Sequence, residues 1–178
     1  TYSFDAIGGT GLPNIKSAAV SKIKDYTYNG KAKTPAVTVK YENKTLAKGK
    51  DYTVSYSKNK GVGKATVIIK GIGSYEGTKT VTFKINPKST SIKQVTAKSN
   101  KATISWKKVA GTTKYQVRYK VNGAKKWTVK NVSANNASVT INKLKKNKKY
   151  SFQVRTYKTV SNVKYYSDWS KTKTARIK

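Results

Sequence analysis

The fold is decided by an alternating stretch in the second half of the chain, Tyr115-Gln116-Val117-Arg118-Tyr119. Successive side chains of a β-strand point to opposite faces, so this stretch predicts a strand that buries Tyr and Val and exposes Gln and Arg. Residues 150–154 alternate in the same way, with Tyr, Phe and Val in the inward positions. Helical spacing is almost absent from the sequence. We therefore expect an all-β protein.

Other β-rich runs of strand length follow one another along the chain, at 36–39, 52–56, 65–69, 81–85, 102–106, 127–129, 138–141 and 174–177. Gly and Asn residues separate them, and many short strands divided by turn signals are typical of β-sandwiches. Pro87 interrupts the series, and residues 86–91 have the composition of a short linker. The simplest organisation is a lead-in segment at 1–14 and two tandem β-sandwich domains at 15–87 and 88–178.

The charge of the chain is strongly one-sided. Lys and Arg number 39 against 6 Asp and Glu, which gives a formal net charge of +33. Residues 1–87 hold 15 lysines and five acids, whereas residues 88–178 hold 24 basic residues and a single acid, Asp168. Such a field favours polyanionic partners: nucleic acid, anionic polysaccharide, a phosphate-rich wall polymer or an anionic membrane surface. The second half should dominate this attraction.

Several kinds of chemistry lack the residues that they need. The chain has no Cys, His or Met, which excludes disulfides, thiol nucleophiles, Cys/His zinc sites and imidazole acid–base catalysis. Six acids are a poor supply for paired catalytic carboxylates or for a calcium site. We expect no enzyme activity, no cofactor and no metal. No apolar run approaches the roughly 20 residues that span a bilayer, so we expect no membrane span.

The second half also carries a set of spaced aromatic and polar residues. Trp106 ends a predicted strand, Leu144 lies six positions before Tyr150, and Tyr166-Ser167-Asp168-Trp169-Ser170 stands near the end. With these features, residues 88–178 resemble a fibronectin type III domain. The resemblance implies an Ig-like β-sandwich with a tyrosine corner, in which the Tyr150 phenol closes a loop onto the backbone.

The first half has its own pattern of Gly, Tyr and Asp residues, in the segments 28–31, 48–54, 63–67 and 71–78. On these, residues 15–86 are similar to the bacterial Ig-like repeats of clostridial-type surface proteins. This resemblance implies an accessory domain of a secreted or wall-attached Gram-positive protein, located outside the cell, at its surface or in its wall. We expect the chain to be a monomeric part of a larger multidomain protein.

Two groups of lysines are the candidate polyanion-binding sites. The densest run is Lys143, Lys145, Lys146, Lys148 and Lys149, in the loop before the strand that begins near Tyr150. The second group consists of Lys114, Lys120, Lys125 and Lys126. Clustered ammonium groups can hold phosphate or sulfate as point charges. The alternative interpretation is a solvated surface with no ligand.

Arginine is rare among the basic residues, and its positions suggest a structural role. Arg118 and Arg155 are both in outward phase on strands that should be neighbours, and Trp169 should follow on the next strand. Guanidinium stacks well on an indole face. We predict a surface ladder of Arg118, Arg155 and Trp169 that is structural, resembling half of the Trp-Ser ladder of cytokine-receptor relatives.

The main functional hypothesis is a non-catalytic spacer and electrostatic tether to teichoic acid or another polyanionic glycan. The alternative is an adhesin-like module that recognises a carbohydrate or a host ligand through exposed aromatics. Trp127, which could stack on a ligand ring, would then act with Tyr157, Tyr165 and Tyr166. Non-specific binding of nucleic acid is expected at low salt, and a pure spacer without a ligand stays open.

Overall fold

The structure is a computed structural model that describes residues 11–178. Within these residues the regular structure is β-strand, apart from one three-residue 3-10 helix, η1 (Ile15–Ser17). The predicted all-β class is confirmed. The described chain forms two compact units, the first made of residues 11–25, Ala32–Lys60 and Lys64–Lys84, the second of Tyr26–Lys31, Gly61–Gly63 and Ile85–Lys178. The ranges 15–87 and 88–178 remain sequence-based predictions, and the expected lead-in segment falls largely outside the described residues.

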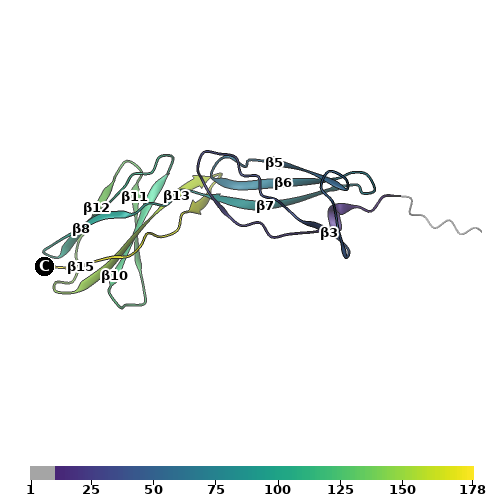
Figure 1. Ribbon diagram of the computed structural model, residues 1–178. Helices are drawn as coiled ribbons and strands as arrows, with labels where there is room; N and C mark the ends of the chain where they lie inside the picture. The colour runs from purple at the N-terminus through teal and green to yellow at the C-terminus, as the bar shows by residue number, and fades with distance from the viewer. Residues whose placement is uncertain (1–10) are drawn as a thin grey trace, which may run out of the picture. The chain divides into compact units, whose positions relative to one another are not determined.

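Two sheets contain the strands of the first half of the chain (Figure 1). The larger sheet has the order β2 (Tyr26–Thr27), β7 (Thr78–Asn86), β6 (Gly63–Gly71) and β5 (Tyr52–Ser57). The smaller sheet has the order β1 (Ala19–Val20), β3 (Val39–Tyr41) and β4 (Lys44–Thr45). β1 with β3, β3 with β4 and β5 with β6 pair in antiparallel fashion, whereas β2 and β7 are parallel. Of the predicted strand 36–39, only Val39 lies in a strand.

The alternation of small and branched apolar residues fits β6 to its place as one of the two inner strands of the larger sheet. Ala65, Val67 and Ile69 are fully buried, and the residues between them are more exposed. Val39 and Ile15 are also fully buried. Each such side chain that leaves water contributes about 1.5 to 3 kcal/mol.

A close approach of two backbone segments fixes the start of the first unit. The Ile15 N–H donates to the Glu76 carbonyl (2.9 Å) and the Glu76 N–H donates to the Pro13 carbonyl (3.1 Å). Asn14 caps η1 by accepting the Lys16 N–H on its Oδ1 (3.0 Å). Gly77 adopts a left-handed φ of 81°, and a Cβ at this position would lie 2.1 Å from the Asn14 Oδ1. A glycine is therefore required at Gly77 by both conformation and space.

Gly77→Ala should destabilise the first unit more than Gly49→Ala does. Gly49 has a similar φ of 87° with nothing within 4 Å of the added Cβ, so it isolates the conformational cost. That cost is about 1 to 2 kcal/mol, and displacing the Asn14 cap adds about 1 kcal/mol at Gly77. Urea unfolding of both variants measures the difference. Equal losses would show that Asn14 moves aside without cost.

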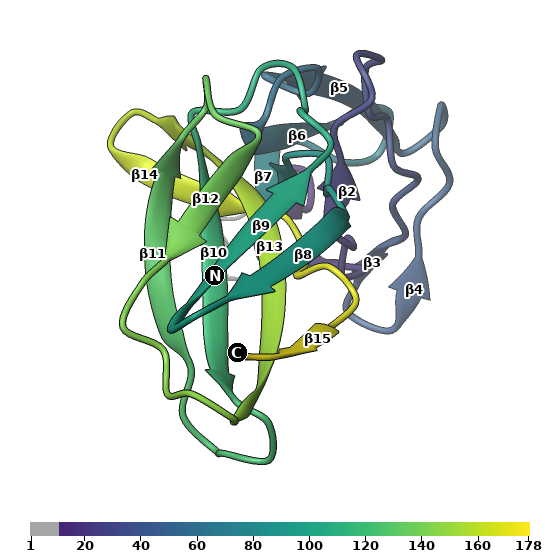
Figure 2. The same ribbon diagram turned by 90° about the vertical axis from the view of Figure 1, so that its left-hand side faces the viewer.

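The second half of the chain contains a three-stranded and a five-stranded sheet, which Figure 2 shows one behind the other. The front sheet has the order β12 (Ser138–Ile141), β9 (Lys101–Trp106) and β8 (Ile92–Lys98). The other has the order β11 (Thr128–Ser133), β10 (Lys114–Val121), β13 (Lys149–Val160) and β14 (Val163–Tyr166), with β15 (Lys173–Arg176) also paired to β13. β8 and β14 were not among the strands predicted from the sequence. The predicted β-sandwich is confirmed.

The core of this sandwich contains the inward residues of the stretches that alternate in the sequence. Tyr115, Val117, Phe152 and Val154 are fully buried, and Trp106 packs on Tyr115 with ring centroids 5.2 Å apart. The tyrosine corner is also confirmed. The hydroxyl of the buried Tyr150 accepts the backbone N–H of Lys145 at 3.1 Å, which holds the loop in front of β13.

Candidate functional site

The outer face of the β10–β13 pair presents four long polar side chains in a fixed arrangement. In the antiparallel register, Arg118 lies opposite Gln153, and Gln116 lies opposite Arg155. The Nε of Arg118 donates to the Oε1 of Gln153 (2.6 Å), and the Nε of Arg155 donates to the Oε1 of Gln116 (2.9 Å). Each guanidinium group is thus held by the glutamine across from it. The predicted outward phase of both arginines agrees with this register.

A segment without regular secondary structure, residues 167–172, runs along β13 and places aromatic rings over these arginines. The backbone N–H groups of Ser167 and Ser170 donate to the carbonyls of Thr156 and Val154 at 3.0 and 2.8 Å. The two serine hydroxyls accept the N–H groups of the same two β13 residues, each at 3.0 Å. Both serines are buried. Trp169 therefore lies in an irregular segment bonded to β13, and the expectation that it would lie on a strand is wrong.

Trp169 lies close to both guanidinium groups. Its ring centroid is 4.3 Å from the guanidinium carbon of Arg118 and 4.3 Å from that of Arg155. The structure thus brings together the three residues of the predicted ladder. At these distances the ring faces attract the cations.

The ladder contains two aromatic residues beyond the three predicted members. The guanidinium carbon of Arg155 lies 3.9 Å from the Tyr166 centroid, and that of Arg118 lies 4.4 Å from the Trp127 centroid. Rings and guanidinium groups therefore alternate along one row, which we call the cation–aromatic ladder. Its members, each in contact with the next, are Trp127, Arg118, Trp169, Arg155 and Tyr166. The spacing of Tyr166 and Trp169, each followed by a serine, is a signal that could have identified Tyr166. Nothing in the sequence places Trp127 beside Arg118.

Packing inside the ladder removes water from the two cations. Burial lowers the pKa of Arg118 below its ordinary value. Burial is also the main reason why the pKa of Arg155 is lowered, with a smaller effect of the same sign from the Arg118 charge and an opposing one from Tyr166. Both groups stay charged at neutral pH, because arginine is not deprotonated in proteins.

The exposure of the side chains tests two of the four aromatic residues proposed to stack on a ligand. Tyr157 and Tyr165 are buried, at 3% and 8% exposure, so the expectation that they present open rings to a ligand is wrong. Trp127 is partly exposed and has a second cation beside it, since the Lys120 Nζ lies 4.7 Å from its ring centroid. Ligand stacking on Trp127 stays a prediction.

The densest basic run lies on a loop whose backbone is firmly held. Lys143, Lys145, Lys146, Lys148 and Lys149 are all exposed, whereas Leu144 is buried between them. The Leu144 N–H donates to the Asn100 carbonyl, and the Asn147 N–H donates to the Ile177 carbonyl, both at 2.9 Å. Asn147 also accepts a hydrogen bond from Arg176 (2.9 Å). Five ammonium groups therefore project from a loop that is tied to two neighbouring segments.

The second basic group is divided by the fold. Lys114 begins β10 and Lys120 lies near its end, which separates them by about 20 Å at the usual rise per residue. A linear polyanion can span that distance, so the grouping of Lys114 with the others stays a prediction. Lys125 and Lys126 are exposed in the loop between β10 and β11. Lys120 and Lys126 line the same hollow as Lys143 of the first group.

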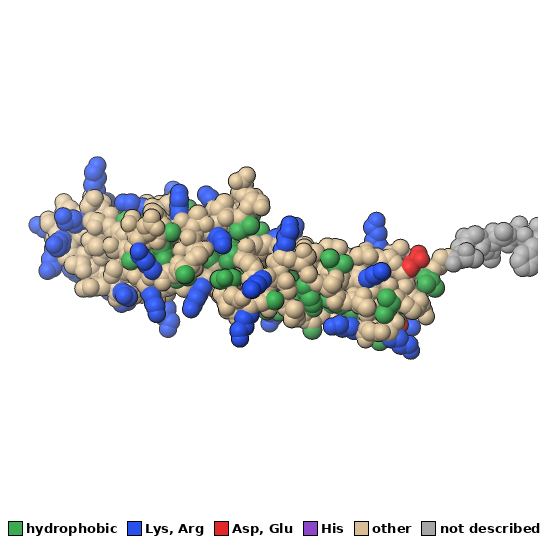
Figure 3. All heavy atoms as spheres, turned by 90° about the horizontal axis from the view of Figure 1, so that it is seen from above, with side chains coloured by type: hydrophobic (Ala, Val, Ile, Leu, Met, Phe, Trp, Pro, Cys, Tyr) green, Lys and Arg blue, Asp and Glu red, His purple; other side chains and the backbone are tan. Residues whose placement is uncertain are grey.

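Basic side chains stand out over the visible surface of the second unit, and no acidic side chain is seen among them (Figure 3). Asp168, the one acid of residues 88–178, is exposed beside Trp169 in the sequence. A field of one sign attracts polyanions and weakens with salt.

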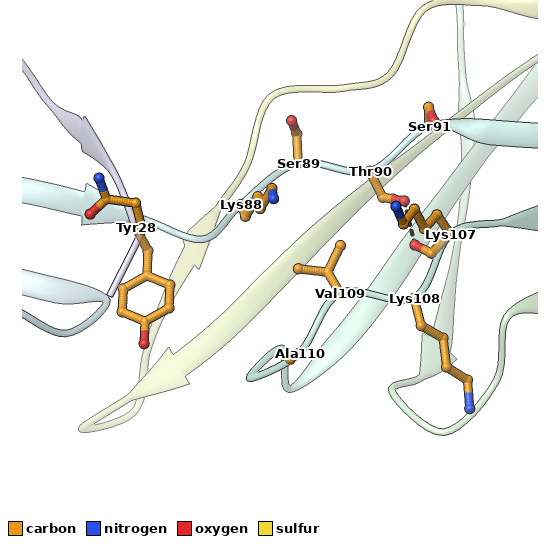
Figure 4. Close-up of a pocket in the computed structure, with 10 residues that line it drawn as sticks. Tyr28, Lys88, Ser89, Thr90, Ser91, Lys107, Lys108, Val109 and Ala110 are labelled. Atoms are coloured by element: carbon orange, nitrogen blue, oxygen red, sulfur yellow. Dashed lines mark hydrogen bonds between the residues drawn. The ribbon is translucent and has the colours of Figure 1, made fainter. Parts of the chain in front are cut away.

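A separate hollow lies along residues 88–91 and the loop after β9 (Figure 4). On its lining, the Thr90 hydroxyl donates a hydrogen bond to the Lys107 carbonyl at 2.6 Å. Val109 and two lysines, Lys107 and Lys108, complete this part of its lining. It holds none of the predicted site residues.

Trp169→Ala should lower the free energy of unfolding of the second unit without weakening polyanion binding. Two guanidinium stacks of about 1 kcal/mol each are lost, which gives a loss of about 2 kcal/mol. Thermal or urea unfolding measures it, with Trp169→Phe as the matched control that keeps a ring and should lose less. Unchanged stability together with lost polyanion binding would contradict the structural role.

Comparison with known proteins gives one family match, in the second half of the chain. The family model for the D2 domain of cytokine receptor-like factor 2-like proteins matches residues 87–178. A myokine structure is 15% identical, with 49% of this chain and 95% of that chain covered and a TM-score of 0.40. The fn3 domain of human contactin 1 is 16% identical, with 51% and 79% covered and a TM-score of 0.42.

A computer-based redesign of a β-sandwich protein is 18% identical, with 51% of this chain and 91% of that chain covered and a TM-score of 0.41. No curated protein matches the sequence. Among the described residues, no helix is long and apolar enough to cross a membrane. The sheet orders, the tyrosine corner and the family match agree on a fibronectin-type-III-like domain. Through residues 87–178, the chain belongs to the family of cytokine receptor-like factor 2-like D2 domains.

Proposed function

We propose that this chain is a non-catalytic, extracellular pair of β-sandwich modules that acts as a spacer and as an electrostatic tether to a polyanion. The observation that carries the proposal is the exposed lysine run 143–149 on a loop held by backbone hydrogen bonds. These ammonium groups lie in a half of the chain with 24 basic residues and one acid. Their mutual repulsion is relieved when a chain of negative charges binds, which is the physical drive for association.

The polyanion that we propose is a phosphate-bearing polymer of a Gram-positive cell wall, such as teichoic acid. Support comes from the similarity of residues 15–86 to bacterial Ig-like repeats of clostridial-type surface proteins, which is a prediction from the sequence. The match to a receptor-like domain family is compatible with a location outside the cell. Lysine suits this ligand because a compact ammonium group attracts phosphate from many directions, without the planar fork of arginine.

The two arginines of the ladder are engaged within the chain. The Nε of each donates to a glutamine, and each guanidinium packs against two rings. The cations left for a ligand are therefore mainly lysines. This division supports attraction between point charges over recognition of a planar group. The aromatic alternative is less supported, because two of its four rings are buried.

Binding to purified Gram-positive cell walls should fall steeply with salt and disappear when teichoic acid is stripped from them. The logarithm of the binding constant should fall by about 0.7 to 0.9 for each phosphate neutralised, per tenfold increase in salt, as for nucleic acids. Co-sedimentation of the 178-residue chain across a salt series measures this. Binding that survives both stripping and salt would contradict the proposal and favour a sugar-stacking site.

A matched pair of variants tests whether the lysine run 143–149 carries the binding to cell walls. Changing Lys145, Lys146, Lys148 and Lys149 to Gln removes four exposed charges from the run, so wall binding should weaken about tenfold or more. The control changes Lys22, Lys24, Lys48 and Lys50, four exposed lysines of the first unit, and should have a much smaller effect. Equal losses would show that the total charge matters and that the run does not.

A further inference from the structure

One hollow of the second unit joins two basic segments that lie apart in the sequence. It has a volume of about 480 Å³ and lies between the β10–β11 loop and the β12–β13 loop. Residues of β10, of both loops and of the starts of β11 and β13 line it. Its size falls within the usual range of small-ligand sites, about 300 to 1,000 Å³.

Three lysines and no acid line this hollow. Lys120 comes from the end of β10, Lys126 from the loop that follows, and Lys143 from the start of the lysine run. Bringing like charges together is unfavourable unless a counterion enters. The hollow therefore has the charge of an anion site. The hollow along residues 88–91 is also lined by three lysines, Lys88, Lys107 and Lys108, but none of them belongs to the lysine run.

Lys120 is held in place before any ligand arrives. Its ammonium group donates a hydrogen bond to the Ala124 carbonyl, and it lies 4.7 Å from the centroid of Trp127. Trp127 in turn contacts Arg118 of the cation–aromatic ladder. Lys120 is partly buried, whereas Lys126 and Lys143 are exposed. One fixed cation and two adaptable ones can thus approach the same anion, and fixing the first lowers the entropy lost on binding.

The wall of the hollow between these charges is largely apolar. Leu144 and Tyr150 belong to the buried core, and Val121 packs against that core. Thr128 and Asn142 supply a hydroxyl and an amide at the exposed side. The lining suits a ligand in which a phosphate alternates with a carbon-rich link.

We infer that this hollow binds one phosphodiester of a polyol-phosphate chain, with Lys120, Lys126 and Lys143 on the phosphate and the apolar wall against the polyol. The inference rests on the proposed function and names the site within it. No arginine lines the hollow, which disfavours single-stranded nucleic acid, because that ligand is commonly held by stacking on aromatics and arginine. The neighbouring Trp127 ring already packs against two cations.

The test compares two triple variants of the whole chain for binding to poly(glycerol phosphate), by calorimetry across a salt series. The hollow variant is K120Q/K126Q/K143Q. The control, K93Q/K98Q/K171Q, removes the same charge from three exposed lysines that line neither this hollow nor the one along residues 88–91. The hollow variant should bind about tenfold more weakly and should lose about one from the salt slope, since its three lysines contact a single phosphate. The control should lose about twofold with its slope nearly unchanged.

The remaining outcomes separate the site from the function. Equal losses of affinity and equal salt slopes in both variants would contradict the assignment of the phosphate site to this hollow, but they would not contradict the electrostatic tether. No binding of the unaltered chain to poly(glycerol phosphate) or to cell walls would overturn both. Competition with inorganic phosphate shows whether phosphate alone occupies the site, and stronger competition by an oligothymidylate of equal charge would overturn the polyol-phosphate assignment. Thermal unfolding of both variants, with unchanged melting temperatures, shows that the losses come from binding.

Discussion

The pairing of β10 with β13 is the interaction on which the second unit depends. It runs in an unbroken antiparallel register from Lys114 opposite Tyr157 to Val121 opposite Tyr150. The inner face of this pair supplies Tyr115 and Val117 to the core, and the outer face supplies both arginines of the ladder. A slip of one residue would turn every side chain to the wrong face. Core and ladder therefore enforce the same register from opposite sides.

The ladder compensates for a surface that carries almost no negative charge. Single ion pairs could add little here, because residues 88–178 hold only one acid. Aromatic rings stabilise the arginines in place of acidic side chains, since the face of an uncharged ring attracts a cation. The serine hydrogen bonds to β13 keep the segment of Trp169 in place. The net positive charge of the unit is thus kept for attraction outward, while its arginines stabilise the fold.

Much of the fold follows from local pattern, and the departures have physical causes. The strand predicted at 138–141 is found as β12, because alternation and turn residues agree there. The run 36–39 has strand-like residues, yet only Val39 pairs, because pairing also needs a partner at the right distance. Trp169 was expected on a strand, but Ser167 and Ser170 bond to β13 through an irregular segment. Tyr166 was missed as a ladder member because β14, which ends at this residue, was not among the predicted strands. Trp127 was missed because its place beside Arg118 depends on the register of β10 with β11.

The sequence by itself determined the all-β class, the inward and outward faces of the main strands and the one-sided charge, since each depends on composition or on spacing within a few residues. The tyrosine corner was expected from the fibronectin type III resemblance, and the structure contains it. Only the tertiary structure decided which side chains meet. It joined Lys120 to Lys143 across one hollow, and it set the order of rings and guanidinium groups in the ladder. The physical reason is that alternation fixes the face on which a side chain lies, whereas its neighbours on that face depend on register and on the paths of the loops.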